Sequence, residues 1–204
     1  MKKEYAFIAV DVQNEFATKG GKYYTPKLSV SFLKNKFFPF LKKKNIKVYE
    51  IISDYRPPRP GRREDCCHPG TWGYQSIVPE KLKKETAWIK CMNSPLWTRK
   101  NIGNKEKTPS KPYQSPKKFD TWLYKNIGNP QNFIPIVFGF TADCCVLATV
   151  QELSWRGYEV WVLKEGVDTA SGKIKDKNAI LKSPMSNWAS IVSWKKVKNH
   201  LLKK

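Results

Sequence analysis

The 204-residue sequence lacks any long apolar stretch. No segment approaches about 18 uncharged apolar residues, the length that marks a membrane-spanning helix, so we expect no membrane span and no membrane partner. Near the amino end, the apolar run of residues 5–10 is short, lacks a cleavage site and ends at Asp11. These features argue against a signal peptide, and we expect a cytoplasmic protein.

Cysteine is also scarce, and its spacing does not resemble a disulfide framework. Four of the five cysteines form two adjacent pairs, Cys66-Cys67 and Cys144-Cys145, which fits free thiols in a reducing compartment better. Adjacent ligands such as Cys66, Cys67 and His68 are a poor arrangement for zinc, and no second Cys/His pair lies nearby. We therefore expect no cofactor and no metal, with zinc as a disfavoured alternative.

Acidic residues are few: the sequence has 17 Asp and Glu residues against 38 Lys and Arg residues, which gives a formal net charge of +21. Such a charge can attract polyanions or anionic surfaces. The lysines are scattered, however, and no arginine-rich tract or nucleic-acid-binding motif accompanies them. A nucleic-acid partner is therefore not expected, although polyanion binding stays open as an alternative.

Apolar runs typical of buried strands alternate with helical spacings along the chain. We expect strands at residues 5–10, 46–52, 86–91, 134–140, 158–163 and 189–193, and helices at residues 29–44, 119–127, 146–155, 174–182 and 195–203. This alternation predicts a Rossmann-like, three-layer α/β/α sandwich with a six-stranded, mainly parallel sheet. Residues 1–204 are expected to form one domain, with residues 99–118 as an exposed basic insertion and a kink at Pro39.

The segment from Ile134 to Thr149 is the main candidate for chemistry. An apolar run ends at Gly139, small residues and two cysteines follow, and a helix-forming pattern then begins. A cysteine in the first turn of a helix lies where unpaired N–H groups and the helix dipole favour a thiolate. Cys145 is therefore a candidate nucleophile, although a lone buried cysteine is more often a small core residue.

Two other ionisable residues come at the ends of expected strands. Asp11 directly follows residues 5–10, and Lys90 lies near the end of residues 86–91. Open α/β sheets build their sites at the carboxyl ends of strands, and a buried lysine needs a counter-charge or a route to water. The structural alternatives are a turn or N-cap role for Asp11 and a surface position on an edge strand for Lys90.

Three segments together resemble the isochorismatase-like cysteine hydrolase superfamily, which includes nicotinamidases and N-carbamoylsarcosine amidases. The first is Ala9-Val10-Asp11-Val12-Gln13-Asn14-Glu15-Phe16, which resembles the family's opening strand and D-x-Q-x-x-F motif. The second, Trp88-Ile89-Lys90, resembles the strand that ends in the family's lysine. The third, Gly139 to Thr149, resembles the pattern G-x-x-T-D-x-C-V-x-x-T.

The resemblance implies a catalytic triad of Asp11, Lys90 and Cys145. Cys145, rather than Cys144, takes the nucleophile position because it directly precedes the valine of the motif. The resemblance also implies a cis peptide bond before Thr141, and an oxyanion hole formed by the N–H groups of Thr141 and Cys145. It further implies an assembly of identical subunits, since members of the family often form dimers or tetramers.

The pocket and the metal positions are less well defined by the resemblance. We expect Phe16 and Trp72 among the substrate contacts. The positions that match the zinc ligands of nicotinamidases are Asp54, Arg56 and Cys66, of which only the aspartate is retained. A cationic arginine opposes a divalent metal, so the resemblance favours a metal-free branch.

The sequence thus predicts a cysteine-dependent hydrolase that cleaves a C–N bond of a small amide or carbamoyl compound through a thioester. Isochorismatases proper lack the nucleophilic cysteine, so Cys145 argues against isochorismate as the substrate. The alternative is a catalytically weak or inactive member of the family that serves as a scaffold, a regulatory protein or a polyanion-binding protein.

Overall fold

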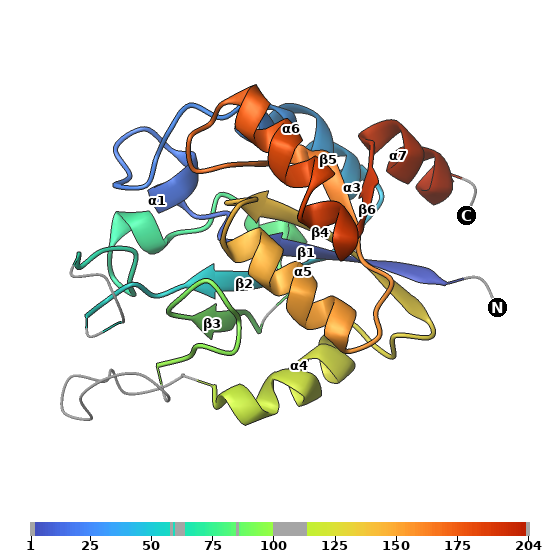
Figure 1. The fold of residues 1–204 in the computed structure, drawn as a ribbon, viewed down its shortest axis with the longest axis horizontal. Helices are drawn as coiled ribbons and strands as arrows, with labels where there is room; N and C mark the ends of the chain where they lie inside the picture. Colours follow the sequence, from blue (N-terminus) through green and yellow to red (C-terminus); the bar gives the residue numbers. More distant parts are fainter. Residues whose placement is uncertain (1–2, 58, 60–63, 85, 100–113, 203–204) are drawn as a thin grey trace.

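The computed structural model describes residues 3–57, 59, 64–84, 86–99 and 114–202 as a single domain (Figure 1). Its sheet contains β1 (Glu4–Val10), β2 (Val48–Ser53), β3 (Trp88–Lys90), β4 (Phe133–Phe140), β5 (Trp161–Asp168) and β6 (Ser190–Val192). All neighbouring strands are parallel, and their spatial order is β3-β2-β1-β4-β5-β6. This is the order of a Rossmann-like sheet, so the predicted three-layer architecture is confirmed.

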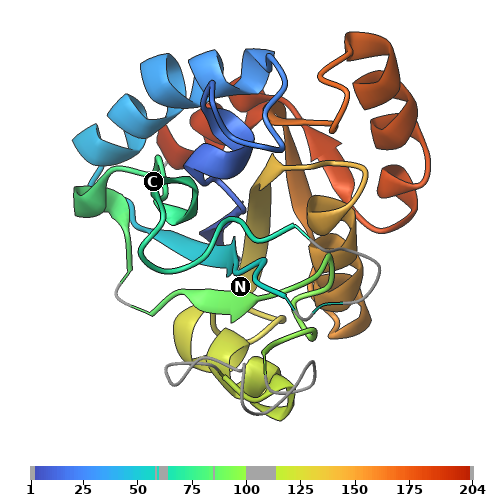
Figure 2. The same cartoon turned by 90° about the vertical axis from the view of Figure 1, so that its left-hand side faces the viewer.

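Helices cover both faces of the sheet (Figures 1 and 2). One face carries α2 (Leu28–Phe32), a π-helical turn (Leu33–Phe37), α3 (Phe38–Lys43) and α7 (Trp194–Leu202). The other face carries α4 (Phe119–Asn126), α5 (Cys145–Trp155) and α6 (Ile174–Lys182). Because strand side chains alternate between faces, Phe7 of β1 packs in the first core and Ile8 in the second, which explains the nearly continuous apolar run.

Three local features differ from the sequence-based expectation. The helix around Pro39 is not simply kinked: a π-helical turn precedes α3, and Pro39 lies in the first turn of α3, where a missing N–H is tolerated. Strand β5 starts at Trp161 rather than at residue 158, because Gly157 and Tyr158 close the end of α5 with bonds to Ser154 and Leu153. A short helix, α1 (Asn14–Ala17), follows β1 and was not expected.

The predicted insertion is only partly described. Residues 100–113 lie outside the described part of the chain, so their predicted exposure stays a prediction. Arg99, at the start of the insertion, is not exposed: its guanidinium is buried and donates to the carbonyl oxygens of Arg56 and Pro57. None of the described helices is long and apolar enough to cross a membrane.

The parallel strands all end at one edge of the sheet, on the left in Figure 1 and facing the viewer in Figure 2. There, β1 and β4 approach each other very closely. Gly139 has a φ of 123°, and a Cβ at this position would lie 2.0 Å from the carbonyl oxygen of Val10. The glycine of the third motif is therefore required where the chain leaves β4 toward the cysteines.

Candidate active site

Asp11 and Lys90 meet at the carboxyl edge of the sheet. Asp11 follows β1 with a φ of 49°, and its backbone N–H donates to Ile51 at the end of β2. Lys90 is the last residue of β3 and pairs in register with Ser53 of β2. Both ionisable side chains are fully buried, and Lys90 Nζ lies 2.7 Å from Asp11 Oδ2.

Ser53 connects the two charges. Its hydroxyl donates to Asp11 Oδ1 at 2.8 Å and accepts a hydrogen bond from Lys90 Nζ at 2.8 Å. Lys90 also donates to the carbonyl oxygen of Met92 at 3.1 Å. Burial lowers the pKa of Lys90, but Asp11, together with the neighbouring Cys145 sulfur, outweighs burial and raises this pKa above its ordinary value. Lys90 therefore stays cationic, and its protons hold the Asp11 carboxylate in place.

Cys145 is the first residue of α5, one turn beyond β4. Its Sγ lies 3.4 Å from the hydroxyl of Tyr55 and 3.6 Å from Oδ1 of Asn93. Burial raises the pKa of the Cys145 thiol to about 12, with Lys90 acting to lower it and Asp11 to raise it. The thiolate expected at the helix terminus is therefore not the resting state, because burial outweighs the nearby cation.

The backbone before Cys145 has the conformation that the resemblance implied. A cis peptide bond joins Phe140 and Thr141. The carbonyl oxygen of Thr141 accepts from the N–H groups of Cys144 and Val146. The N–H groups of Thr141 and Cys145 have no acceptor in the described part of the chain, and both residues line the same cavity. Two backbone donors are thus free at the predicted oxyanion hole.

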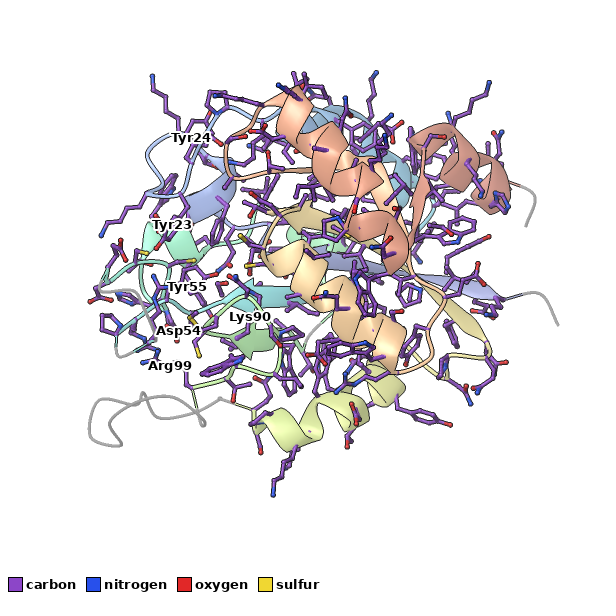
Figure 3. All side chains as sticks on the ribbon, in the orientation of Figure 1. Tyr23, Tyr24, Asp54, Tyr55, Lys90 and Arg99 are labelled. Atoms are coloured by element: carbon purple, nitrogen blue, oxygen red, sulfur yellow. The ribbon has the colours of Figure 1, made fainter. Side chains whose placement is uncertain are left out.

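The cavity above the sulfur has a volume of about 560 Å³, which suits a small molecule. Residues from α1 and the loop after it, the loops after β2, β3 and β5, and the β4–α5 turn surround it. They are Phe16, Lys22, Tyr23, Tyr24, Thr25, Tyr55, Arg59, Met92, Asn93, Thr141, Cys144, Cys145 and Ala170. Figure 3 shows Tyr23, Tyr24, Tyr55 and Lys90 toward this edge of the sheet.

The two residues expected to contact substrate differ in their placement. Phe16 is buried and lines the cavity. Trp72 does not line it: its side chain is 47% exposed and its indole lies near Gly20. Trp72 was expected among the substrate contacts, but its side chain is exposed to solvent.

Solved structures with the same architecture identify the fold. No protein-family model and no curated protein sequence matches the chain. Among solved structures, the chain is similar to an isochorismatase-like hydrolase from Alkaliphilus metalliredigens, with 15% identity, a TM-score of 0.67, and coverage of 97% of this chain and 98% of the other.

Two further structures give the same result. The zinc-bound pyrazinamidase of Pyrococcus horikoshii has 22% identity and a TM-score of 0.62, and the match covers 94% of this chain and 99% of the other. The N-carbamoylsarcosine amidase of Thermoplasma acidophilum has 19% identity and a TM-score of 0.60, and the match covers 93% of this chain and 96% of the other. The chain has the isochorismatase-like hydrolase fold.

Within this isochorismatase-like fold, the residues at the implied zinc positions do not fit the metal. Both carboxylate oxygens of the buried Asp54 accept from the Arg56 guanidinium, at 3.0 and 2.5 Å. No group of three or more His, Cys, Asp or Glu side chains among the described residues could hold a metal ion.

Sequence reasoning missed several residues of this site, among them Ser53, Tyr55, Arg59 and Asn93. Ser53 and Tyr55 come at and just after the end of β2, and the rule that placed Asp11 and Lys90 at strand ends could have found them. Arg59 and Asn93 lie on loops whose path the sequence does not reveal. Only the folded chain places their side chains around Cys145.

Proposed function

We propose that the protein is a cysteine-dependent amidohydrolase that cleaves a C–N bond of a small amide or carbamoyl compound. The observation that carries the proposal is the buried Asp11–Lys90 ion pair beside the Cys145 thiol, under a cavity of small-molecule size. Solved structures that share the fold include amidases, which supports hydrolysis of C–N bonds as the reaction class.

In the first half of the proposed reaction, Asp11 accepts the thiol proton as the Cys145 sulfur attacks the carbonyl carbon. The resting thiol is neutral because of its burial, so the base must act during the attack. The developing oxyanion accepts hydrogen bonds from the N–H groups of Thr141 and Cys145. A single donor of this kind contributes roughly 3–4 kcal/mol to the stability of a transition state.

The tetrahedral intermediate then collapses and the C–N bond breaks. Asp11 returns the proton to the leaving nitrogen, which departs as ammonia or an amine, and the acyl group stays on sulfur as a thioester. In the second half, water attacks the thioester while Asp11 accepts a proton from it. The C–S bond breaks, the sulfur regains its proton, and a carboxylic acid is released.

Lys90 and Tyr55 assist without taking up the substrate's acyl group. The Lys90 cation stabilises the negative charge that passes between Asp11 and the sulfur. Burial, together with the neighbouring Cys145 and Asp11, raises the pKa of Tyr55 well above its ordinary value, so its hydroxyl stays protonated. It can therefore donate a hydrogen bond to the sulfur when the sulfur becomes anionic.

The test is ammonia release from a panel of small primary amides and carbamoyl compounds, with and without a chelator. We expect turnover that is insensitive to the chelator and lost in a Cys145→Ala variant. Cys144→Ala is the matched control, since Cys144 also lines the cavity but lies one residue from the nucleophile position. Equal turnover by both variants would overturn the assignment, and no turnover on any amide would favour a non-catalytic scaffold.

A further inference from the structure

We propose that the substrate carries a carboxylate in addition to its scissile amide, and that Arg59 binds this carboxylate. The inference rests on the proposed function and adds the substrate class. The feature that suggests it is a buried cation in the wall of the catalytic cavity. The side chain of Arg59 is only 3% exposed, yet it lines the cavity that contains Cys145.

Arg59 is linked to the nucleophile through Tyr55. Its guanidinium lies 4.2 Å from the centre of the Tyr55 ring, and its Nε donates to the Tyr55 carbonyl oxygen at 3.1 Å. The hydroxyl of the same tyrosine contacts Cys145 Sγ. A single side chain therefore separates the cation from the sulfur, so one small molecule can reach both.

Among the described residues, Arg59 has one acidic partner, and that partner is not close. One terminal nitrogen donates to the Tyr23 hydroxyl at 2.9 Å, and its ion-pair partner is Glu64 at 3.8 Å, whose side chain is 47% exposed. The other terminal nitrogen, Nη1, has no acceptor among the described residues. Glu64 is thus a distant, partly exposed counter-ion for a buried cation, and a carboxylate from the substrate would supply a closer one through paired N–H···O bonds.

The remaining walls of the cavity also favour an anion. Lys22 adds a second cation to the lining, while the described lining residues include no aspartate or glutamate. Phe16 and Tyr23 stack at an interplanar angle of 12°, and both meet Tyr55 edge-on. These rings give a rigid apolar middle section between the sulfur and the guanidinium, which suits a short carbon chain with a polar group at each end.

A charge series of equal-length amides tests the proposal. The substrates are succinamate, which is anionic, butyramide, which is neutral, and 4-aminobutanamide, which is cationic. We expect kcat/KM for ammonia release to fall in that order. In Arg59→Gln, kcat/KM for succinamate should fall about 10- to 100-fold, while the value for butyramide changes about 3-fold or less.

Arg156→Gln is the matched control, because it removes the same charge from the carboxyl end of α5, where the arginine pairs with Glu152 and Asp120. It should leave the substrate order unchanged. An equal loss on succinamate and butyramide in Arg59→Gln would show that Arg59 only supports the fold of the cavity. That result, or a preference of the wild type for butyramide, overturns the proposal while the hydrolase assignment stands.

Binding measurements test the carboxylate site independently of the proposed hydrolase activity. Calorimetry on the Cys145→Ala variant should show tighter binding of succinamate than of butyramide, and Arg59→Gln in the same background should abolish the difference. If this pattern appears but no amide is hydrolysed by the wild type, the hydrolase proposal fails and the carboxylate site stands. If the wild type hydrolyses amides but Cys145→Ala binds succinamate and butyramide equally tightly, the carboxylate site fails and the hydrolase proposal stands.

Discussion

Replacing Lys90 by methionine tests whether the Asp11–Lys90 pair is both a structural and a catalytic unit. Both side chains are fully buried and their charged atoms are 2.7 Å apart. In Lys90→Met, the Asp11 carboxyl group loses its buried counter-ion and keeps the hydroxyl of Ser53 as its side-chain donor among the described hydrogen bonds. Breaking a buried ion pair from one side costs about 3–5 kcal/mol, so we expect a loss of that size in the free energy of unfolding.

A double variant separates the two roles of the pair. Asp11→Asn together with Lys90→Met removes both charges, so the penalty of an unpaired buried charge disappears. We expect the double variant to be about 2–3 kcal/mol more stable than the sum of the single effects would give. Activity should be absent from all three variants, because the base and the cation are both needed for proton transfer.

Urea unfolding at pH 7 provides the stabilities, and ammonia release provides the activity. Lys177→Met is a matched control, since Lys177 and Asp168 form a second buried pair at 3.3 Å that does not line the cavity. The control should lose stability but retain turnover. A cost below about 1 kcal/mol for Lys90→Met, or strictly additive effects in the double variant, would refute the reasoning.

Two other predictions follow from the surroundings of the sulfur. Tyr55→Phe keeps the ring against Phe16 but removes the hydrogen-bond donor to the sulfur, so kcat should fall roughly 10- to 100-fold with little change in stability. Tyr49→Phe on β2 is the control. Equal activity of the two variants would refute the role of the Tyr55 hydroxyl. The second concerns alkaline pH. The Cys145 thiol has a pKa of about 12 when folded against an ordinary value of 9.0, so between these pH values the unfolded chain loses a proton that the folded chain keeps. The contribution of the thiol to stability is thus complete below about pH 9 and is lost as the pH rises toward 12. In Cys145→Ala, the unfolding free energy should therefore fall less steeply over this range, by up to about 1.4 kcal/mol per pH unit. Parallel pH profiles for wild type and variant would show that the thiol is not held neutral by burial.

The order of the elements and the meeting of the three motif residues could be predicted from the sequence. Parallel strands end at one edge, so residues at the ends of β1 and β3 and just after β4 had to converge. This is why Asp11, Lys90 and Cys145, which are far apart in the chain, are found close together at one edge of the sheet. The cis peptide before Thr141 was expected only through the resemblance, and the structure confirms it.

Loop geometry and burial could not be predicted in the same way. No sequence pattern indicates that Arg59 lies in the cavity wall or that Trp72 lies outside it, because both positions depend on how the segment between β2 and β3 folds back. The raised pKa of Cys145 could not be predicted from the sequence either. A helix terminus and a lysine favour a thiolate, but the degree of burial, which decides the balance, is visible only in the folded chain.

The covalent intermediate offers the most direct test of the account. Turnover of a reactive small amide is stopped with acid, and the modified residue is located by peptide mass mapping. The account predicts an acyl group on Cys145, its absence from Cys145→Ala protein, and its persistence in Cys144→Ala protein. An acyl group on any other residue, or undiminished turnover without Cys145, would contradict the account.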